Sequence, residues 1–177
     1  MFTSLRDYVG AVGGAGSVDR VFRGEVYLSS GAYDDVHFSA LVGRASEELD
    51  VAVDEFLFDF GVFTAERTFT GLYPAFFSER TSARDFLLTV ESRIHELVRV
   101  TVPHARPPRL TVSELGEHGV SIAYSSPRKL CVLLRGLAQG VALHYLEPIT
   151  IEETTCMRRG DEACTFDVRF RAERQTA

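Results

Sequence analysis

His95 is the first residue of the sequence whose type and setting could bind a metal. It lies in the stretch Ser82 to Val100, where apolar residues recur at helical spacing, on the flank of the main apolar stripe. A neutral imidazole on a rigid helix suits a metal ion or a haem iron, and the small Ser92 one turn earlier leaves room for a flat ring. For one histidine taken alone, a solvated position at the edge of a surface helix is the commoner case.

Tyr124, Ser126 and Arg128 form a second group, in the segment Ala-Tyr-Ser-Ser-Pro-Arg-Lys. Alternate residues of an extended segment point to one side, and Pro127 favours an extended backbone at Ser126. A phenol, a hydroxyl and a planar guanidinium on one side form a receptor for one or two carboxylates. Taken alone, the pattern also fits a strand end that faces solvent.

Three cysteines form the third group. Cys156 and Cys164 bracket a turn at Arg158 to Asp161, so a hairpin could bring both thiols near Cys131. An odd number of cysteines disfavours a disulfide framework, and three thiolates supply most of a tetrahedral zinc site. Three buried or spare thiols are an equally good interpretation.

Helices must position the first of these groups. Helical spacing of apolar residues predicts helices at Tyr33 to Leu49, Val53 to Phe63 and Ser82 to Val100. Two shorter helices are expected at Met1 to Val12 and Ser17 to Phe22, because the glycines between them interrupt a continuous helix.

Strands must position the other two groups. Beyond the prolines of residues 103–108 the period changes to alternation, which predicts a hairpin around Gly116 to Gly119. A helix over Arg128 to His144 follows, and then a second hairpin formed by Ile149 to Met157 and Thr165 to Phe170. The sequence therefore predicts one α+β domain over residues 1–177, with a helical half at about 1–105 and a β-β-α-β-β antiparallel half at about 106–171.

The composition limits the possible functions. The chain has 177 residues, 45% of them apolar, which is enough for one compact domain. Its net charge of -6 disfavours nucleic acid as a partner, because an acidic protein repels phosphates. No apolar run is long enough for a membrane span, and Met1 to Tyr8 lacks a signal pattern, so we expect a cytoplasmic protein.

Five short motifs occur in the order that one known family shows. They are Phe60-Gly61, Tyr73-Pro74-Ala75-Phe76-Phe77, Ile94-His95-Glu96, Arg106-Pro107-Pro108 and Tyr124-Ser125-Ser126-Pro127-Arg128. With these motifs the chain resembles the haem-nitric oxide/oxygen-binding (H-NOX) domain, the haem sensor module also found in soluble guanylate cyclase. The resemblance is strongest from Phe60 to Arg128 and extends loosely over most of the chain.

This resemblance implies that a haem b lies between the two halves of the domain. His95 would be the proximal ligand of the haem iron. The Tyr124, Ser126 and Arg128 side chains would bind the haem propionates. Pro108 would press on the porphyrin and help to distort it from planarity. One cofactor would thus use both the metal ligand and the carboxylate receptor.

The resemblance also places four residues in the distal pocket, where a gas would bind: Phe2, Ala65, Phe69 and Leu133. Oxygen-binding relatives carry a tyrosine at the position of Leu133, and it donates a hydrogen bond to bound oxygen. Bound oxygen is partly negative and profits from a donor, whereas bound NO is nearly neutral and needs none. Because none of the four side chains is a donor, we expect binding of NO, weaker binding of CO and exclusion of oxygen.

The zinc interpretation of the cysteines gains a fourth ligand from the resemblance. Some H-NOX proteins carry a zinc site with similar cysteine spacings, and there the remaining ligand lies three residues before the cysteine that Cys156 matches. Here that residue is Glu153, whose carboxylate could bind zinc, and His144 is a second possibility.

The implied function is a haem-based gas sensor that signals without turnover: NO weakens the bond between the iron and His95, and the two halves shift. Because the chain ends soon after Phe170, we expect a separate partner of bacterial two-component or cyclic-di-GMP signalling, either a sensor histidine kinase or a diguanylate cyclase or phosphodiesterase.

Two other classes of protein remain open. A haem-free small-molecule-binding regulatory module, resembling vinyl-reductase-like domains, would share the Cys156 to Cys164 pattern and would not need His95. A haem enzyme such as a peroxidase would need a distal acid-base residue, which Leu133, Phe69 and Ala65 do not supply.

Overall fold

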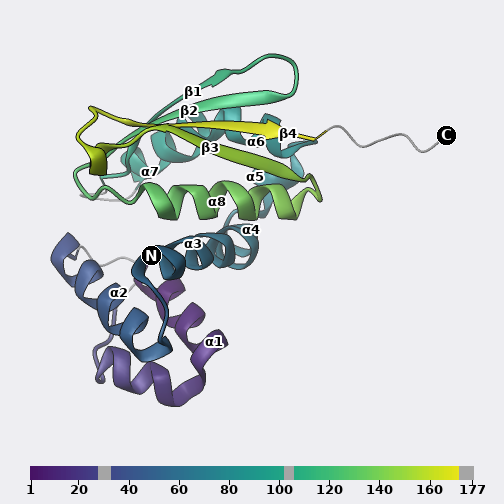
Figure 1. Ribbon diagram of the computed structural model, residues 1–177. Helices are drawn as coiled ribbons and strands as arrows, with labels where there is room; N and C mark the ends of the chain where they lie inside the picture. Colours follow the sequence, from purple (N-terminus) through teal and green to yellow (C-terminus); the bar gives the residue numbers. More distant parts are fainter. Residues whose placement is uncertain (28–32, 102–105, 172–177) are drawn as a thin grey trace.

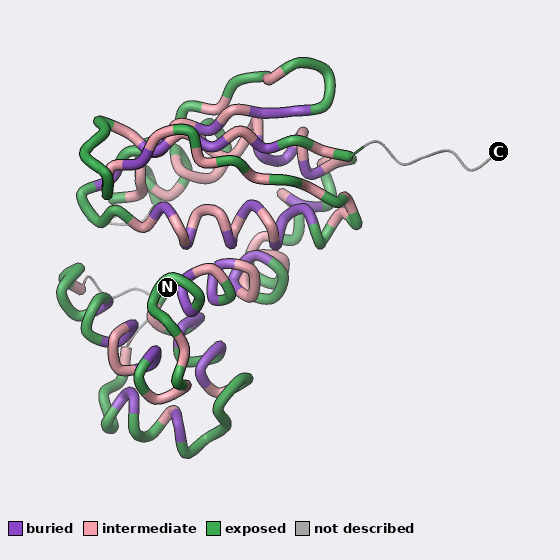
Figure 2. Tube along the Cα trace, viewed as in Figure 1, coloured by how far each residue is buried: buried purple, intermediate pink, exposed green. Residues whose placement is uncertain are grey.

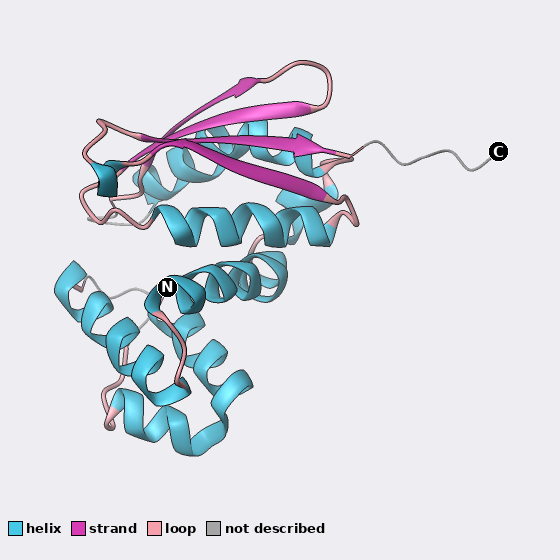
Figure 3. Ribbon diagram, in the orientation of Figure 1, coloured by secondary structure: helices cyan, strands magenta, loops and turns pink. Residues whose placement is uncertain are grey.

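The computed structural model describes residues 1–27, 33–101 and 106–171, which form an antiparallel sheet above a set of helices (Figure 1). The first three helices are α1 (Phe2–Phe22), α2 (Asp35–Leu49) and α3 (Val53–Phe63). The long helix α8 (Cys131–His144) lies between α3 and the sheet. Figure 3 shows the strands of the sheet and the helix α8 beneath them in different colours. The predicted α+β class is confirmed.

The remaining helices connect α3 to the sheet. In chain order they are the π-helical η1 (Thr64–Phe69), α4 (Thr70–Leu72), α5 (Pro74–Ser78), α6 (Ala83–Val90), the π-helical η2 (Glu91–His95) and α7 (Glu96–Thr101). Ser82 begins α6 as its N-cap, since its hydroxyl accepts a hydrogen bond from Asp85 N at 3.0 Å. The helix predicted at Ser82 to Val100 is therefore present, but its middle turn is a π-helix, a form often found at functional sites.

The helix α1 contains the interruption that the glycines predict. Its two parts meet at Gly14, where φ is 77° and ψ is -179°. A side chain is strained at that positive φ, so a glycine there allows the chain to turn between the two helical parts.

The second half of the chain has the predicted β-β-α-β-β order. Its strands are β1 (Arg109–Glu114), β2 (Gly119–Ser125), β3 (Ile149–Thr155) and β4 (Cys164–Phe170), with the short 3-10 helix η3 (Met157–Arg159) before β4. The strand order in the sheet is β1-β2-β4-β3. Tyr124 pairs with Leu110 on one side and with Cys164 on the other, and all three are buried. One inward row of the sheet thus runs from β1 to the cysteines.

The described residues form two hydrophobic cores. The first joins α1, α2 and α3 and includes Leu5, Phe56 and Phe60. The second lies beneath the sheet, includes Phe86 and Phe166, and is packed by α6 and α8. Figure 2 shows buried positions on both sides of α8. The helices of the expected helical half are therefore divided between two layers, and the helix that carries His95 packs on the sheet.

The helices α3 and α8 form the main contact between the two cores. They approach so closely that a Cβ added at Gly136 would lie 2.0 Å from the carbonyl oxygen of Phe58. A Cβ added at Gly61 would lie 2.5 Å from the carbonyl oxygen of Leu133. Glycine is therefore required on both helices for backbone to meet backbone.

Within the described ranges, every helix is too short or too polar to cross a membrane.

Candidate functional site

His95 ends the π-helical segment η2 with one ring nitrogen already engaged. Its Nδ1 lies 2.7 Å from Oε2 of Glu91, one turn earlier on the same helix. A carboxylate accepts a hydrogen bond, so Nδ1 carries the proton and Nε2 is the nitrogen with a free lone pair. The side chain is 17% exposed, which keeps the ring at the edge of the second core.

Glu91 connects this helix to the sheet. Besides His95, its carboxylate accepts hydrogen bonds from Nη2 of Arg99 at 2.6 Å and from the backbone N–H of Leu110 at 3.2 Å. Arg99 also donates to the carbonyl oxygen of Pro108 at 3.3 Å. Burial opposes ionisation of Glu91, but the hydrogen bonds from Arg99 and His95 outweigh it and hold the pKa of this carboxyl below its ordinary value.

Tyr124 lies next to this network in the sheet, because it is the register partner of Leu110. Its hydroxyl oxygen accepts a hydrogen bond from Leu130 N at 3.0 Å, and burial raises the pKa of the phenol. Ser126 is also buried, and its Oγ accepts a hydrogen bond from Arg128 N at 3.3 Å. The structure thus brings the phenol and the hydroxyl into the part of the fold that holds His95.

Arg128 already binds a carboxylate in this structure. Its Nε lies 2.6 Å from Oδ1 of Asp35, the first residue of α2. Both side chains are well exposed, so the ion pair can open at small cost. The guanidinium is therefore accessible to another carboxylate.

The surroundings of His95 and Tyr124 suit a flat apolar ring with acidic substituents. Half-buried apolar side chains pack against the second core, to which Tyr124 belongs: Leu88, Val90 and Ile94 lie on the helical segments that lead to His95, and Phe69 and Phe76 lie on η1 and α5. A haem needs a ligand for its iron, groups that bind its carboxylates and an apolar surface for its ring. The free imidazole nitrogen, the carboxylate receptor and the half-buried apolar side chains are of these three kinds. On this chemistry the residues present fit a haem.

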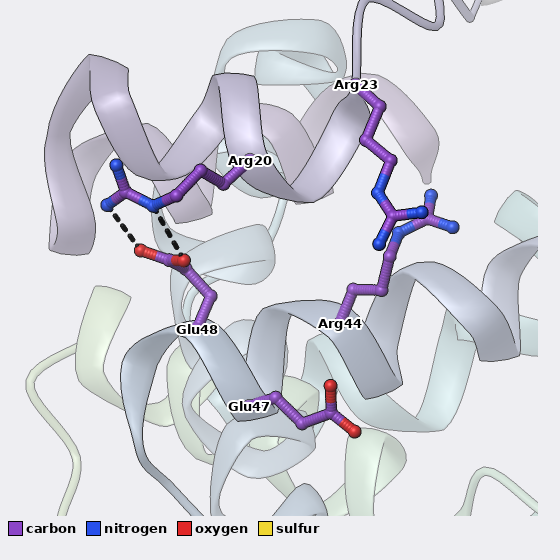
Figure 4. Close-up of a pocket in the computed structure, with 5 residues that line it drawn as sticks. All are labelled: Arg20, Arg23, Arg44, Glu47 and Glu48. Carbon is purple, nitrogen blue, oxygen red and sulfur yellow. Dashed lines mark hydrogen bonds and ion pairs between the residues drawn. The ribbon is translucent and has the colours of Figure 1, made fainter.

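Two surface hollows in the described part of the chain lie elsewhere. One, with about 550 Å³ of empty space, lies between α1 and α2 (Figure 4). It is lined by Arg20, Arg23, Arg44, Glu47 and Glu48, and Arg20 and Glu48 close one side as an ion pair. The other has about 960 Å³ and includes Ser82, His118 and Tyr145. Neither hollow includes His95 or the residues of the carboxylate receptor.

The four residues expected around a gas ligand divide between the two cores. Leu133 and Phe2 pack in the first core, where the Phe2 ring stacks on Tyr27 at 4.6 Å. Ala65 and Phe69 pack in the second. The structure therefore places two of these residues in each core.

A hydroxyl that the sequence analysis missed lies beside Ala65. Thr64 is fully buried at the start of η1, and the structure gives its Oγ1 no hydrogen-bond partner among the residues that it describes. The sequence around Thr64 does not indicate an unpaired hydroxyl, because a threonine in a helix usually donates a hydrogen bond to a backbone carbonyl one turn earlier.

The three cysteines are buried and lie together, and Glu153 joins them. Ligand atoms of Cys131, Glu153, Cys156 and Cys164 all lie within 4.8 Å of one another. Alternation along β3 would place residues 153 and 156 on opposite faces, but the register shift between Glu153 and Thr155 adds one residue. This bulge turns both side chains inward. Burial raises the pKa of Cys164 to about 12 and also raises the pKa of Cys131, so both thiols are neutral near pH 7.

The alternative ligand His144 is wrong. It is the last residue of α8 and Cys131 is the first, which separates them by about 20 Å along the helix at the usual rise per residue. The His144 ring packs instead against Phe77, with ring centroids 4.8 Å apart.

Two charged residues of the site were also missed. Glu91 has a signal in the sequence, since an acidic residue four positions before a helical histidine faces it. Asp35 has none, because its contact with Arg128 joins segments that are far apart in the chain.

Comparisons with known proteins identify the family and the fold of the chain. A family model described as Haem-NO-binding matches residues 17–153. No curated protein matches the chain. The fold is similar to that of an H-NOX protein from S. oneidensis in the Fe(II)NO state, with a TM-score of 0.89, 22% identity and coverage of 97% of each chain.

Two further solved structures show the same fold. The H-NOX protein from K. algicida in the unliganded Fe(II) state has a TM-score of 0.83 and 22% identity, over 99% of this chain and 97% of that chain. The H-NOX domain from Shewanella oneidensis in the Fe(II)CO state has a TM-score of 0.88 and 21% identity, over 97% of each chain.

Proposed function

The chain belongs to the haem-NO-binding family, a family of haem-based gas sensors, and on this premise we propose that it is a sensor that binds haem b and prefers NO to oxygen. One observation carries the proposal. His95 presents a free Nε2 beside the sheet row that holds Tyr124, because Glu91 engages both His95 Nδ1 and the Leu110 N–H.

The chain's own residues would hold the cofactor from two directions. Nε2 of His95 would bind the iron, and Arg128 would leave Asp35 to pair with a propionate. The Tyr124 and Ser126 hydroxyls would donate hydrogen bonds to the same acidic groups. Pro108, half-buried before β1, would limit the space on the histidine side. The haem supplies an iron that binds a diatomic gas.

The preference for NO follows from the side chains expected at the gas. Phe2, Ala65, Phe69 and Leu133 offer no hydrogen-bond donor, and a buried donor to a partly negative ligand is worth on the order of 1 kcal/mol or more. Oxygen would lose this stabilisation, whereas NO does not depend on it. The Thr64 hydroxyl, which is next to Ala65 in the chain, is a donor to test directly, because it is buried without a partner among the described residues.

The route of the signal would begin at the helix of His95. Hydrogen bonds of Glu91 and Arg99 connect this helix to Leu110 and Pro108 at the start of β1. A displacement of His95 would therefore move the first strand of the sheet. The close contact of α3 with α8 would then relay the movement to α1 and α2. A separate sensor histidine kinase or a cyclic-di-GMP enzyme would read this change, and the chain would carry out no turnover itself.

Absorption spectra of the purified protein supplied with haem test this proposal. The reduced protein should bind NO and CO and should give no stable oxygen complex in air. A stable oxygen complex would contradict the gas preference. A protein that stays colourless with ample haem would contradict the sensor function and favour a haem-free small-molecule module. Rapid turnover of peroxide would favour a haem enzyme.

The cysteine cluster supports a second proposal, a structural zinc ion bound by Cys131, Cys156, Cys164 and Glu153. The ligand atoms converge from the start of α8 and from both strands of the β3–β4 hairpin, so zinc would join these three segments. Glu153 has one oxygen paired with Arg159 at 2.9 Å, which leaves the other for the metal.

Metal analysis of protein purified without a His tag tests the zinc proposal. We expect one equivalent of zinc, weaker binding in Glu153→Gln, and unchanged binding in the control Glu152→Gln, whose side chain is exposed on the neighbouring position of β3. Zinc well below one equivalent in the unaltered protein would refute the site.

A further inference from the structure

We propose that Glu91 is a positioning residue that sets how strongly His95 donates electrons to the iron, and that it thereby makes the iron–histidine bond harder to break. The inference rests on the proposed haem-binding function. It concerns the carboxylate that accepts a hydrogen bond from His95 Nδ1.

The geometry gives Glu91 a fixed orientation. Its Oε2 accepts hydrogen bonds from His95 Nδ1 at 2.7 Å and from Leu110 N at 3.2 Å, and its Oε1 accepts from Arg99 at 2.6 Å. These three donors come from η2, from β1 and from α7. A carboxylate held from three directions cannot rotate away from the imidazole without losing bonds to two other elements.

The setting makes this contact stronger than an ordinary surface pair. The side chains of His95 and Glu91 are 17% and 30% exposed, so water screens their interaction only partly. A hydrogen bond to a charged acceptor is about twice as strong as one between neutral groups. His95 is therefore held in one tautomer and one ring orientation, with Nε2 presented for binding.

The electronic consequence follows from the negative charge on Glu91. A carboxylate that accepts the Nδ1–H bond raises the basicity of the imidazole, while the proton stays on Nδ1. A more basic ligand stabilises ferric iron more than ferrous iron, because the ferric ion carries one more positive charge. The same increase in donation would oppose release of His95 from the iron on binding of NO. Glu91 would thus lower the reduction potential and raise the threshold at which NO releases His95.

The size of the effect can be stated as a ratio. Replacing a carboxylate behind a metal-bound histidine typically changes metal affinity by about 10-fold to 100-fold. A tenfold change in the preference for ferric over ferrous iron corresponds to about 59 mV for one electron. We therefore expect Glu91→Gln to raise the midpoint potential by roughly this amount, and Glu91→Leu by more, because leucine removes the acceptor as well as the charge.

Glu96→Gln is the matched control. It removes the same charge from the residue next to His95, but the Glu96 side chain is exposed, and in the part of the chain that the structure describes the His95 ring pairs with Glu91. An effect of net charge alone would shift the midpoint potential of all three variants by a similar amount. Loss of the contact between Glu91 and His95 would shift the midpoint potential of the two Glu91 variants and leave that of Glu96→Gln close to the value of the unaltered protein.

Three measurements on the haem-loaded protein test the inference: the midpoint potential, the iron–histidine stretching frequency, and the fraction of the NO complex that keeps its histidine. For Glu91→Gln we expect a higher potential, a lower frequency and a smaller fraction. Unchanged values in a folded, haem-loaded Glu91→Gln would overturn the role of Glu91.

Two observations keep the inference separate from the proposed function. If the unaltered protein binds no haem, the proposed function fails first, and the haem-free protein still reports on the contact. There, nitrogen NMR of His95 should show the proton on Nδ1 in the unaltered protein and a mixture of tautomers in Glu91→Leu. An unaltered protein without a preference for the Nδ1 proton would overturn the inference on its own. Far-UV circular dichroism shows whether a variant is folded. If Glu91→Leu is unfolded, the result for Glu91→Gln, whose side chain has nearly the shape of glutamate, decides whether the inference holds.

Discussion

Gly136→Ala tests the contact between the two cores. A Cβ at this position would lie 2.0 Å from the carbonyl oxygen of Phe58 and 3.0 Å from Cα of Gly61. Both atoms are backbone, so no flexible side chain can move aside. The helices α3 and α8 would have to separate, and the first core, which contains Leu133 of α8, would have to follow.

The expected magnitude is a balance of two terms. Forcing extra atoms into a tightly packed contact typically costs about 1–3 kcal/mol, and a rigid backbone neighbour favours the upper end. Alanine in a helix interior recovers roughly 1 kcal/mol relative to glycine. We expect Gly136→Ala to lower the free energy of unfolding by about 2 kcal/mol, a shift in Tm of roughly 4–8 °C for a chain of this size.

Gly43→Ala is the control, because Gly43 lies within α2 and a Cβ there would meet no atom within 4 Å. It should stabilise the protein by about 0.5–1 kcal/mol. Urea unfolding followed by far-UV circular dichroism, at equal haem loading, measures both variants. A Gly136→Ala protein as stable as Gly43→Ala would refute the close contact of α3 with α8.

Three other predictions concern single polar groups. Hydrogen bonds from Arg20 and Ser17 lower the pKa of Glu48 from 4.5 to about 2, so Glu48 stabilises the fold above its unfolded pKa and loses this contribution as the pH falls through the folded value. Glu48→Gln should therefore lose less stability than the unaltered protein between pH 4.5 and about 2 in acid titrations followed by circular dichroism; an identical acid limb would contradict the ion pair. Thr64→Val removes a buried hydroxyl without a partner among the described residues and should raise the free energy of unfolding by about 1 kcal/mol. A large decrease in the free energy of unfolding would contradict the absence of a partner for this hydroxyl. Asp35→Asn frees Arg128 and should raise haem affinity by no more than about fivefold, since an exposed pair is worth at most about 1 kcal/mol; weaker haem binding would show that Asp35 helps to hold the cofactor.

The order of the elements could be predicted from the sequence because each element has a local signal. Helical spacing identified the helix around His95, and alternation with glycine turns identified both hairpins. The order of motifs from Phe60 to Arg128 identified the family, which the match over residues 17–153 shows. Local patterns were sufficient for these features because neighbours in the chain determine them.

Contacts between distant segments could not be predicted in the same way. The ion pair of Arg128 with Asp35 and the bond of Leu110 to Glu91 depend on how the layers pack. The π-helical turn at Glu91–His95 adds a residue to one turn, which no periodic pattern in an isolated helix shows. His144 was wrong as a ligand because α8 places it at the opposite end of the helix from Cys131.

The central claim is that Nε2 of His95 binds haem iron. The most direct test compares haem binding by the unaltered protein, by His95→Gly and by His118→Gly, in which an exposed histidine of the β1–β2 turn is removed. The account predicts an iron–histidine vibration in the unaltered protein and in His118→Gly, its loss in His95→Gly, and its return when free imidazole is added. An iron–histidine vibration that persists in His95→Gly without imidazole would contradict the account.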